Sequence, residues 1–381
     1  MYTFGIIIYG YFLFIHSMNI LKPFVIGLEY QVSRNTKLLK SRLEAAGPTY
    51  IKIGQFVSNR PDVFGKALSS ELATLQDSVT PTPSQKTPPP GVTCDPVPFA
   101  SASIAQVHLG TYKGKQVAVK IKRPEVDRRL RQDLSGFKLL MRDDPKFMTD
   151  FEDSLIKELD FNQEVRNAQE FARMYDFDRT VRIPEVYPEV CTEDIIVMDY
   201  VESTPGVPRA ERLINMFLEQ LLFEDVIHGD MHSGNIGLDK DGALILYDFG
   251  NVIRTTREYR DATREFVWHL QSRDIPKIIQ TMRKMGMYVS NEKATKAFIQ
   301  KLLRYIDSMD IAEFRFTADE IQERVPVILD PVTSAIVRSF SLLEGYCKSV
   351  DPGFSYERII SSNLETLFAD PAYLLSRIFK M

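Results

Sequence analysis

The sequence has few cysteines, and their number and spacing count against both a disulfide-bonded fold and a fold built on a cysteine–zinc site. Cys94, Cys191 and Cys347 are the only three in 381 residues. An odd, widely spaced set is typical neither of a disulfide framework nor of a cysteine-based zinc site. We therefore expect the chain to work in a reducing compartment.

An excess of positive charge is also absent. The chain has 47 Lys and Arg against 51 Asp and Glu, a formal net charge of −4. Domains that bind nucleic acid usually carry a basic patch or stripe. The charge balance therefore gives no support for broad nucleic-acid binding, and we expect no nucleic-acid partner.

The first 21 residues, MYTFGIIIYGYFLFIHSMNIL, lack acidic and basic side chains apart from His16. This length just suffices for a helix that crosses a bilayer. The segment also lacks the basic start of a secretory signal and the Arg-rich character of a transit peptide. Residues 1–28 are thus a hydrophobic segment for which a membrane helix, a buried or interfacial helix, or a true start at Met18 are open alternatives.

Apolar periodicity divides the rest of the chain into helical and β-rich parts. Residues 29–80 are predicted to be helical, with Pro48 suited to a first helical turn. Prolines dominate residues 81–97, which predicts a linker. Residues 98–201 are predicted to form a β-rich lobe, and residues 202–381 a mainly helical one.

The stretch PFASASIAQVHLGTYKGKQVAVKIKRP predicts two strands around a turn at TYKGK. Phosphate loops usually contain glycines, which let backbone N–H groups approach phosphate oxygens closely. The first bend here has Ala100, Ser101, Ala102 and Ser103 instead. We expect a modified phosphate loop, with Ala102 and Ser103 at the nucleotide.

The segment VIHGDMHSGNIGLDKDGALILYDFG carries the most specific chemical signal. Asp230, Asn235 and Asp248 have the spacing of a phosphoryl-transfer site. Asp230 would orient the attacking hydroxyl, while Asn235 and Asp248 are hard oxygen ligands for Mg²⁺. A hairpin turning at Asp241-Gly242 is expected to bring the two metal ligands together. Isolated Asp and Asn would merely cap turns, but the whole constellation favours catalysis.

A lysine for the phosphates is expected upstream, in VAVKIKRP. Lys120 and Lys122 lie on the same face of a strand, so alternation does not choose between them. The run Val-Ala-Val-Lys matches the strand lysine of kinases and favours Lys120, which leaves Lys122 as an expected solvated neighbour. Glu158, Asp160 and Glu164 are all candidate partners for Lys120.

Other elements are predicted from shorter patterns. A single long helix is expected to begin near Phe151, and residues 182–190, RIPEVYPEV, are expected to form a strand. The strand in DIIVMDYV is expected to lead to a hinge, where Asp199 and Val201 offer backbone groups to adenine. Helices are expected to dominate from Arg257 onward.

Together these motifs resemble the UbiB/ABC1/ADCK group of atypical kinase-like proteins over roughly residues 40–370. GPTYIKIGQFVSNRPD resembles the family's KxGQ motif, and FASASIAQVH its alanine-rich loop. ELDFNQE is similar to its ExD motif, HGDMHSGN…YDFG to its catalytic and metal loops, and LLEGYCKSVDPGF to a segment near the carboxyl end.

The resemblance implies an α+β, bilobal protein-kinase-like fold. It assigns residues 29–80 to a KxGQ helical extension, 98–201 to the N-lobe and 202–381 to a mainly helical C-lobe. ATP and Mg²⁺ are the implied cofactors. Glu164 is the implied partner of Lys120, and the residues implied to regulate the site, where the KxGQ helix meets the ExD motif, are Lys52, Gln55, Glu158 and Asp160.

The function implied by the resemblance is that of an ATPase or a small-molecule or lipid-linked phosphotransferase supporting quinone or isoprenoid-lipid metabolism. Its expected partners are a membrane lipid or an isoprenoid- or quinone-like molecule, together with proteins of lipid biosynthesis. The implied location is a membrane of a mitochondrion, a plastid or a bacterium. No Ala-Pro-Glu segment follows Asp-Phe-Gly250, which counts against protein substrates.

Two alternatives stay open at this point. Small-molecule kinases of the aminoglycoside or choline type also have catalytic loops reading His-Gly-Asp-x-His-x-x-Asn, although the KxGQ-like and ExD-like segments count against them. A pseudokinase scaffold would bind nucleotide without turnover. The retained Lys120, Asp230, Asn235 and Asp248 count against that reading.

Overall fold

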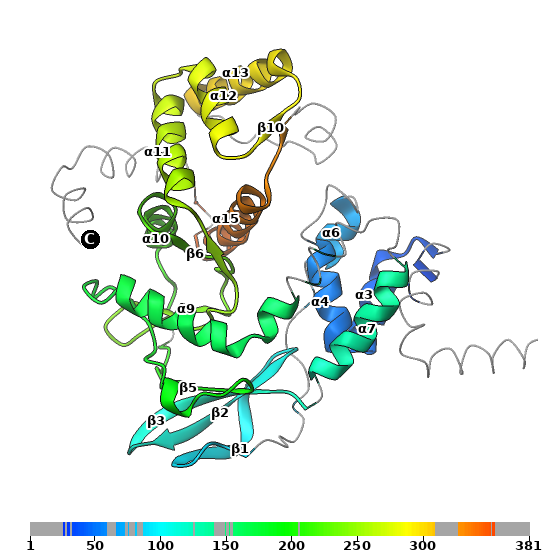
Figure 1. Cartoon of the computed structure of the whole chain (residues 1–381), viewed down its shortest axis with the longest axis vertical. Helices are drawn as coiled ribbons and strands as arrows, with labels where there is room; N and C mark the ends of the chain where they lie inside the picture. Colours follow the sequence, from blue (N-terminus) through cyan, green and yellow to red (C-terminus); the bar gives the residue numbers. More distant parts are fainter. Residues whose placement is uncertain are drawn as a thin grey trace, which may run out of the picture. The chain divides into compact units, whose positions relative to one another are not determined.

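The computed structural model describes residues 26, 29–30, 33–58, 66–72, 75, 81, 87–124, 126–140, 149, 152, 155–204, 206–308, 327–351 and 353–354. The chain forms two compact units (Figure 1). Met1–Arg173 and Pro184–Tyr200 form the first unit, and Met174–Ile183 and Val201–Met381 form the second. The apolar segment expected at residues 1–21 lies outside the described residues. Among the helices that are described, none has the length and apolar character needed to cross a membrane.

Four helices of the first unit share one apolar core. They are α3 (Thr36–Ala46), α4 (Pro48–Ser58), α6 (Lys66–Leu72) and α7 (Val126–Leu140). The helical character predicted for residues 29–80 is confirmed for most of the described part of that range, and α4 begins at Pro48 as expected. A Cβ on Gly54 would lie only 2.2 Å from Leu75 Cδ1, so α4 packs this closely because the residue is glycine.

A four-stranded antiparallel sheet follows, with the order β1-β2-β3-β5. Its strands are β1 (Val92–Ser101), β2 (Ala105–Tyr112), β3 (Lys115–Lys122) and β5 (Ile195–Asp199). The predicted hairpin is confirmed, and its turn places Lys113 and Gly114 at positive φ, as tight hairpin turns require. The strand expected in DIIVMDYV is confirmed as β5.

Two predictions for this region are wrong. The linker expected over residues 81–97 includes most of β1, because β1 is an edge strand whose register shifts around Pro98, and prolines are tolerated at edges and bulges. The strand expected over residues 182–190 is mostly irregular. Only β4 (Val181–Arg182) reaches into it, and a 3₁₀ turn occupies Pro188–Val190.

The long helix expected from Phe151 is interrupted at Asp160. Residues 155–159 are helical, and α9 spans Phe161–Met174. The Asp160 carboxylate accepts a hydrogen bond from the Gln163 N–H at 2.9 Å, so Asp160 caps the start of α9. Glu158 and Glu164 therefore lie on two separate helical segments.

The second unit is mainly helical. Its described residues form three small antiparallel strand pairs, β6 with β9, β7 with β8 and β10 with β11, and β4 extends the second pair in parallel. The predicted turn at Asp241-Gly242 is confirmed, with Gly242 at a φ of +82°. The dominance of helices after Arg257 is also confirmed. The elements, in chain order, are α10 (Ala210–Phe223), β6 (Val226–His228), β7 (Ile236–Leu238), β8 (Leu244–Leu246), β9 (Val252–Arg254), α11 (Arg257–Gln271), α12 (Ile275–Lys284), β10 (Tyr288–Val289), α13 (Glu292–Ser308), β11 (Val327–Ile328) and α15 (Pro331–Val350).

Candidate functional site

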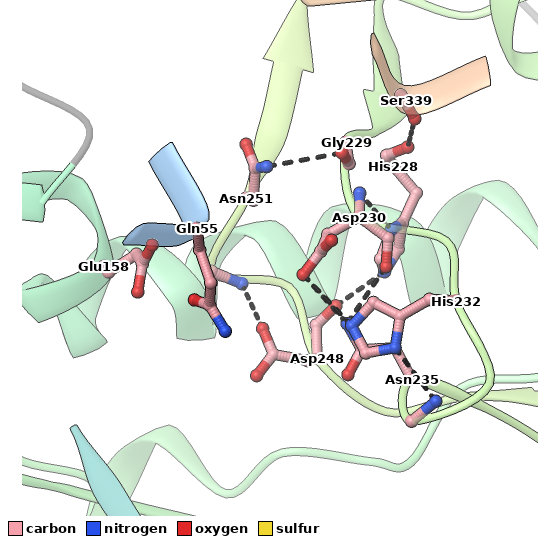
Figure 2. A network of polar contacts seen from close by, with 12 residues as sticks. Gln55, Glu158, His228, Gly229, Asp230, His232, Asn235, Asp248, Asn251 and Ser339 are labelled. Atoms are coloured by element: carbon pink, nitrogen blue, oxygen red, sulfur yellow. Dashed lines mark hydrogen bonds and ion pairs between the residues drawn. The ribbon is translucent and has the colours of Figure 1, made fainter. Parts of the chain in front are cut away.

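His228 joins the two loops of the second unit that carry the predicted catalytic and metal residues (Figure 2). It ends β6, is fully buried, and its Nδ1 accepts a hydrogen bond from the Asp230 N–H at 3.2 Å. Its Nε2 lies 2.6 Å from the Asp248 carbonyl oxygen, to which it donates. Burial lowers the pKa of His228, so the imidazole is neutral and serves as donor and acceptor at once.

The two loops have further supports within the second unit. The Gly229 N–H donates to the Asn251 carbonyl at 2.8 Å. Ser339, on α15, donates its hydroxyl to the His228 carbonyl at 2.9 Å, and Gln220, on α10, accepts from the His228 N–H at 2.8 Å. These contacts fix the backbone directly before Asp230.

Asp230 and Asn235 meet directly. The Asn235 amide donates to the Asp230 carbonyl at 3.0 Å and to Asp230 Oδ2 at 3.2 Å. His232 Nε2 lies 3.4 Å from the same carboxylate oxygen. Burial favours the neutral acid, but the hydrogen bond and charge of His232 outweigh it and hold the pKa of Asp230 below its ordinary value. Asp230 is thus an ionised carboxylate that accepts hydrogen bonds.

Asn235 and Asp248 are brought together by the β7–β8 hairpin. The Tyr247 N–H donates to the Asn235 carbonyl at 3.1 Å, which places the residue before Asp248 beside Asn235. Asp248 accepts the Gly250 N–H at 2.9 Å through one carboxylate oxygen. Because the Asn235 amide nitrogen faces Asp230, its amide oxygen is the atom that would bind a cation.

This donor set fits Mg²⁺. It consists of hard oxygens, and Mg²⁺ usually takes one or two protein carboxylates together with water and substrate phosphates. Within the described ranges, no group of three or more His, Cys, Asp or Glu side chains is arranged to hold a metal ion. Asn235 and Asp248 would therefore hold the ion jointly with phosphate oxygens of a nucleotide.

In the first unit, Lys120 on β3 and Glu164 on α9 form the expected ion pair. Lys120 Nζ lies 2.6 Å from Glu164 Oε1, and the side chains are 14% and 5% exposed. The Lys120 ammonium also lies 5.4 Å from the centre of the Phe161 ring. A buried, charge-assisted contact of this kind holds the lysine in one place.

The alanine-rich bend is held by one hydrogen bond within the bend and by hydrogen bonds from one arginine. The Ala102 N–H donates to the Ala105 carbonyl at 2.9 Å, and Arg123 Nε donates to the Ala102 carbonyl at 2.7 Å. Arg123 also donates to Ser101 Oγ at 2.6 Å. The Ser103 hydroxyl is buried with no hydrogen-bond partner among the described residues, so it is an orphaned donor at the bend where phosphate is expected.

The two residues expected at the hinge, Asp199 and Val201, differ in which backbone group is already hydrogen-bonded within the protein. The Asp199 N–H donates to the Glu185 carbonyl at 2.8 Å, which leaves the Asp199 carbonyl as its group for adenine. In the second unit, the Val201 carbonyl accepts from the Tyr247 hydroxyl at 3.5 Å. Val201 would therefore contribute its N–H.

The residues expected to regulate the site lie in the first unit. Lys52 Nζ, on α4, lies 3.1 Å from Glu158 Oε2. Gln55 donates to the Leu75 carbonyl at 3.5 Å, and Asp160 caps α9. The structure therefore joins Lys52 to Glu158 and gives Gln55 and Asp160 other partners.

One expectation is wrong and one contact was not foreseen. Lys122 is 6% exposed, not solvated, because it faces Phe161 on the same side of β3 as Lys120. Sequence reasoning missed Arg123 as the residue that holds the alanine-rich bend. The signal was its position directly after β3, where the last β2–β3 pair, Ala105 with Lys122, places it beside the bend.

Comparison with known proteins identifies the family. Residues 92–282, half of the chain, match the ABC1 atypical kinase-like domain. The chain belongs to the ABC1 atypical kinase-like family. The mixed α+β architecture predicted from the sequence is confirmed, and it is a kinase-like fold.

Relatives cover most of the chain. Protein ACTIVITY OF BC1 COMPLEX KINASE 1, chloroplastic, from Arabidopsis thaliana is 26% identical in an alignment 380 positions long, which covers 87% of this chain and 56% of the relative. Protein ACTIVITY OF BC1 COMPLEX KINASE 8, chloroplastic, from the same organism is 28% identical over 85% of this chain and 53% of its own length. The chain thus spans about half the length of these ABC1 relatives.

Two mycobacterial proteins are also similar. Uncharacterized protein MT0675 from Mycobacterium tuberculosis is 28% identical over 80% of this chain and 72% of its own. The solved Rv3197–erythromycin complex from Mycobacterium tuberculosis has a TM-score of 0.46 and 22% identity, and the match covers 69% of this chain and 78% of that one.

Proposed function

We propose that this ABC1-family protein binds Mg·ATP and transfers or hydrolyses the terminal phosphoryl group, as an ATPase or as a small-molecule or lipid-linked phosphotransferase. The observation that carries the proposal is the arrangement of Asp230, Asn235 and Asp248 on two loops joined by His228. A bound Mg²⁺ would neutralise charge on the phosphates. Asp230, ionised, would accept the hydrogen bond of an attacking hydroxyl or water and orient it.

The Lys120–Glu164 pair supports the same proposal. A lysine fixed by a buried carboxylate presents a positive charge at one position, as phosphate binding in kinase-like sites requires. The orphaned Ser103 hydroxyl would donate to phosphate or to an ordered water. Asp199 and Val201 would contribute the carbonyl and the N–H for adenine.

A small substrate suits the second unit better than a peptide does. After Gly250 the chain enters β9, which pairs with β6, and α11 begins at Arg257 with Thr256 as its cap. Residues 251–256 thus connect the metal loop directly to the next helix. Protein kinases carry a long segment at this position that docks peptides.

We further propose that the substrate or partner belongs to quinone or isoprenoid-lipid metabolism at a membrane. The names of the Arabidopsis relatives refer to the activity of the bc1 complex and to the chloroplast. The sequence resemblance points the same way. At such a membrane the protein would contact a membrane lipid and proteins of lipid biosynthesis.

Turnover of ATP tests the proposal. Purified protein should release phosphate from Mg·ATP, and vesicles of phosphatidylcholine and cardiolipin should change the rate. Asp230→Asn should lower the rate by about 10²-fold or more, since general acid–base catalysis contributes roughly 10²–10⁴-fold. It should leave Mg·ATP binding intact, because Asp230 is not a metal ligand in this proposal. Binding without turnover in the wild type would instead indicate a scaffold.

A further inference from the structure

Two aromatic rings from opposite edges of the four-stranded sheet meet in the first unit. Phe99 lies in β1 and Tyr200 directly follows β5, and the sheet order β1-β2-β3-β5 places two strands between them. Their ring centres are 5.7 Å apart and their planes are inclined by 83°, an edge-to-face contact. Because neighbouring strands lie about 4.8 Å apart, the two side chains must reach across one face of the sheet to meet.

The strand register shows that the rings cross the face that carries Lys120. In the β3–β5 ladder Lys120 pairs with Ile196. The Tyr200 N–H donates to the Gln116 carbonyl at 3.2 Å, which continues this ladder by one residue past β5. Side chains at even spacing along a strand share a face, so the Tyr200 side chain lies on the Lys120 face.

The opposite face of the sheet is covered by a buried core. There the Asp199 carboxylate accepts a hydrogen bond from the Tyr187 hydroxyl, and Tyr187 packs in one cluster with Val119, which is 0% exposed. Since Asp199 and Tyr200 are consecutive, alternation directs the Tyr200 side chain away from this core. Phe99, whose ring contacts Tyr200, therefore lies over the Lys120 face as well.

An irregular β1 explains how Phe99 reaches over the sheet. Cys94 pairs with Gly110 and Pro98 with His108, so β1 contains extra residues between these two pairs. A second register shift follows directly after Pro98, at Phe99. Bulges of this kind bend a strand and redirect a side chain.

The Lys120 face between the two edges of the sheet is apolar and partly open. Val107 of β2 pairs with Lys120, and Leu109 pairs with Ala118. Both β2 side chains are half-buried, and Phe99 is 56% exposed. A flat aromatic group would bury apolar surface against these side chains and would gain ring contacts from Phe99.

The groups around this surface identify the ligand that suits it. Lys120, to which the proposed function assigns phosphate, lies on the same face, and the Asp199 carbonyl, proposed for adenine, directly precedes Tyr200. A ligand with phosphate at the lysine and a flat ring between the two aromatic residues is a nucleotide. We propose that Phe99 and Tyr200 form an aromatic clamp for the adenine base. The clamp deepens the proposed function and rests on it for the position of the phosphates.

Adenosine, which has the base but no phosphate, tests the clamp separately from phosphoryl transfer. Phe99→Ala and Tyr200→Ala should each weaken binding of adenosine and of Mg·ATP to the full-length protein by about fivefold or more, the lower end for losing a base–aromatic stack. Phe99→Tyr keeps the ring and should keep the affinity. Val97→Ala, at a 73% exposed position of the same strand, should have no effect. Mg·tripolyphosphate, which lacks the base, should bind every variant alike.

Phe99→Trp in a Trp268→Phe background gives a direct readout of stacking. Trp268, on α11 of the second unit, is the only tryptophan of the sequence, so the indole at position 99 would be the sole one. Adenosine should quench its fluorescence saturably, and Mg·tripolyphosphate should not. Melting curves show whether each variant is folded, and the indole tests the clamp even if an alanine variant is not.

An unquenched indole, or equal adenosine and Mg·ATP affinity in the wild type, Phe99→Ala and Tyr200→Ala, would overturn the clamp. A parallel loss of Mg·tripolyphosphate binding would also overturn it, because the two residues would then act on the phosphate site. Adenosine binding that depends on both rings, without phosphate release from Mg·ATP, would leave the clamp in place and overturn the proposed function alone.

Discussion

His228 Nε2 lies 2.6 Å from the Asp248 carbonyl oxygen, while Nδ1 of the same ring accepts the Asp230 N–H. One neutral imidazole thus sets the distance between the loop of the proposed catalytic carboxylate and the loop of the proposed metal ligand. Both bonds use backbone groups of these loops, so the ring does not engage the two carboxylates. Since the ring is fully buried, protonation would place an unfavourable charge there.

We expect the stability of the protein to fall in mild acid because of His228. Burial puts the folded-state pKa of His228 below that of the unfolded chain, so the unfolded chain binds more protons in acid. This contribution is fully present above about pH 6.5, the ordinary value for histidine, and is lost as the pH falls toward the folded-state pKa. His228→Gln should lower the free energy of unfolding by roughly 1–3 kcal/mol, because the Asp230 N–H loses its acceptor.

Thermal midpoints at pH 7.5 and pH 5.5 check this. The difference between them should be smaller in His228→Gln than in the wild type. His269→Gln, the same change on α11, should keep the difference seen in the wild type. If both variants respond to pH alike, His228 is not the group responsible.

We expect Lys120 and Glu164 to behave as one unit. Lys120→Met leaves the Glu164 carboxylate, only 5% exposed, without its closest cation, and should cost roughly 3–5 kcal/mol of stability. Adding Glu164→Gln should recover much of this loss, so the two changes should be far from additive. Each single variant should also weaken Mg·ATP binding.

Two other ion pairs of the first unit serve as controls for this cycle. Lys113→Met removes an exposed partner of Glu189 and should change stability little, because exposed ion pairs contribute little. Glu158→Gln should couple to Lys52→Met, with which it shares a contact at 3.1 Å. Strong coupling of Lys120 to Glu158, beside additive effects for Lys120 and Glu164, would reverse the pairing.

The sequence predicted local contacts best where residue spacing and secondary structure determine them. The β7–β8 hairpin followed from Asp241-Gly242, and with it the approach of Asn235 toward the Asp248 loop. Helical periodicity could not place the break at Asp160, because the capping bond to Gln163 competes locally with continuation of the helix. The proline content similarly led to the prediction of a linker where β1 lies, since an edge strand tolerates prolines, which lack a backbone N–H donor.

Burial was harder to predict than position. The sequence placed Lys122 on the same face as Lys120, but its burial depends on Phe161 of α9, which is distant along the chain. The contact of Arg123 with the alanine-rich bend likewise depends on strand register, which alternation alone does not set. Both contacts required tertiary structure.

We expect Asp248→Asn to abolish Mg²⁺-dependent nucleotide binding while leaving the fold intact. Replacing the carboxylate removes the charged member of the proposed Asn235–Asp248 ligand pair, and Mg²⁺ needs such a charge. Wild-type protein at about 100 times the dissociation constant of Mg·ATP should gain about 2.7 kcal/mol, seen as a raised thermal midpoint. The variant should show no such gain, and chelation with EDTA should remove the gain from the wild type.

Asp241→Asn is the matched control for the metal site. It makes the same change in the turn of the same hairpin, at an exposed position, and should keep the full shift with Mg·ATP. An undiminished shift in Asp248→Asn would show that Asp248 is not the metal ligand. A lowered midpoint without nucleotide would point to a structural role instead.

We expect Ala102→Gly to change nucleotide affinity, or the preference for ATP over ADP, with little loss of stability. Ala102 is exposed and lies between β1 and β2, not within a strand, so glycine there costs less than the roughly 0.5–1 kcal/mol typical of element interiors. Both backbone groups of Ala102 are held, the N–H by Ala105 and the carbonyl by Arg123. In this state the backbone of the bend is hydrogen-bonded within the protein. Glycine at position 102 could adopt positive φ, which would let backbone N–H groups of the bend turn toward phosphate.

Arg123→Lys tests the same bend from its other side. Lysine lacks the planar fork that reaches both the Ala102 carbonyl and Ser101 Oγ, so the bend should loosen and affinity should change in the same direction as in Ala102→Gly. Ala100→Gly, within β1, is the control and should lower the melting point without changing affinity. Calorimetric titration with Mg·ATP and Mg·ADP, beside melting curves, separates these outcomes. Unchanged affinities in both Ala102→Gly and Arg123→Lys would mean that the closed bend does not bind phosphate.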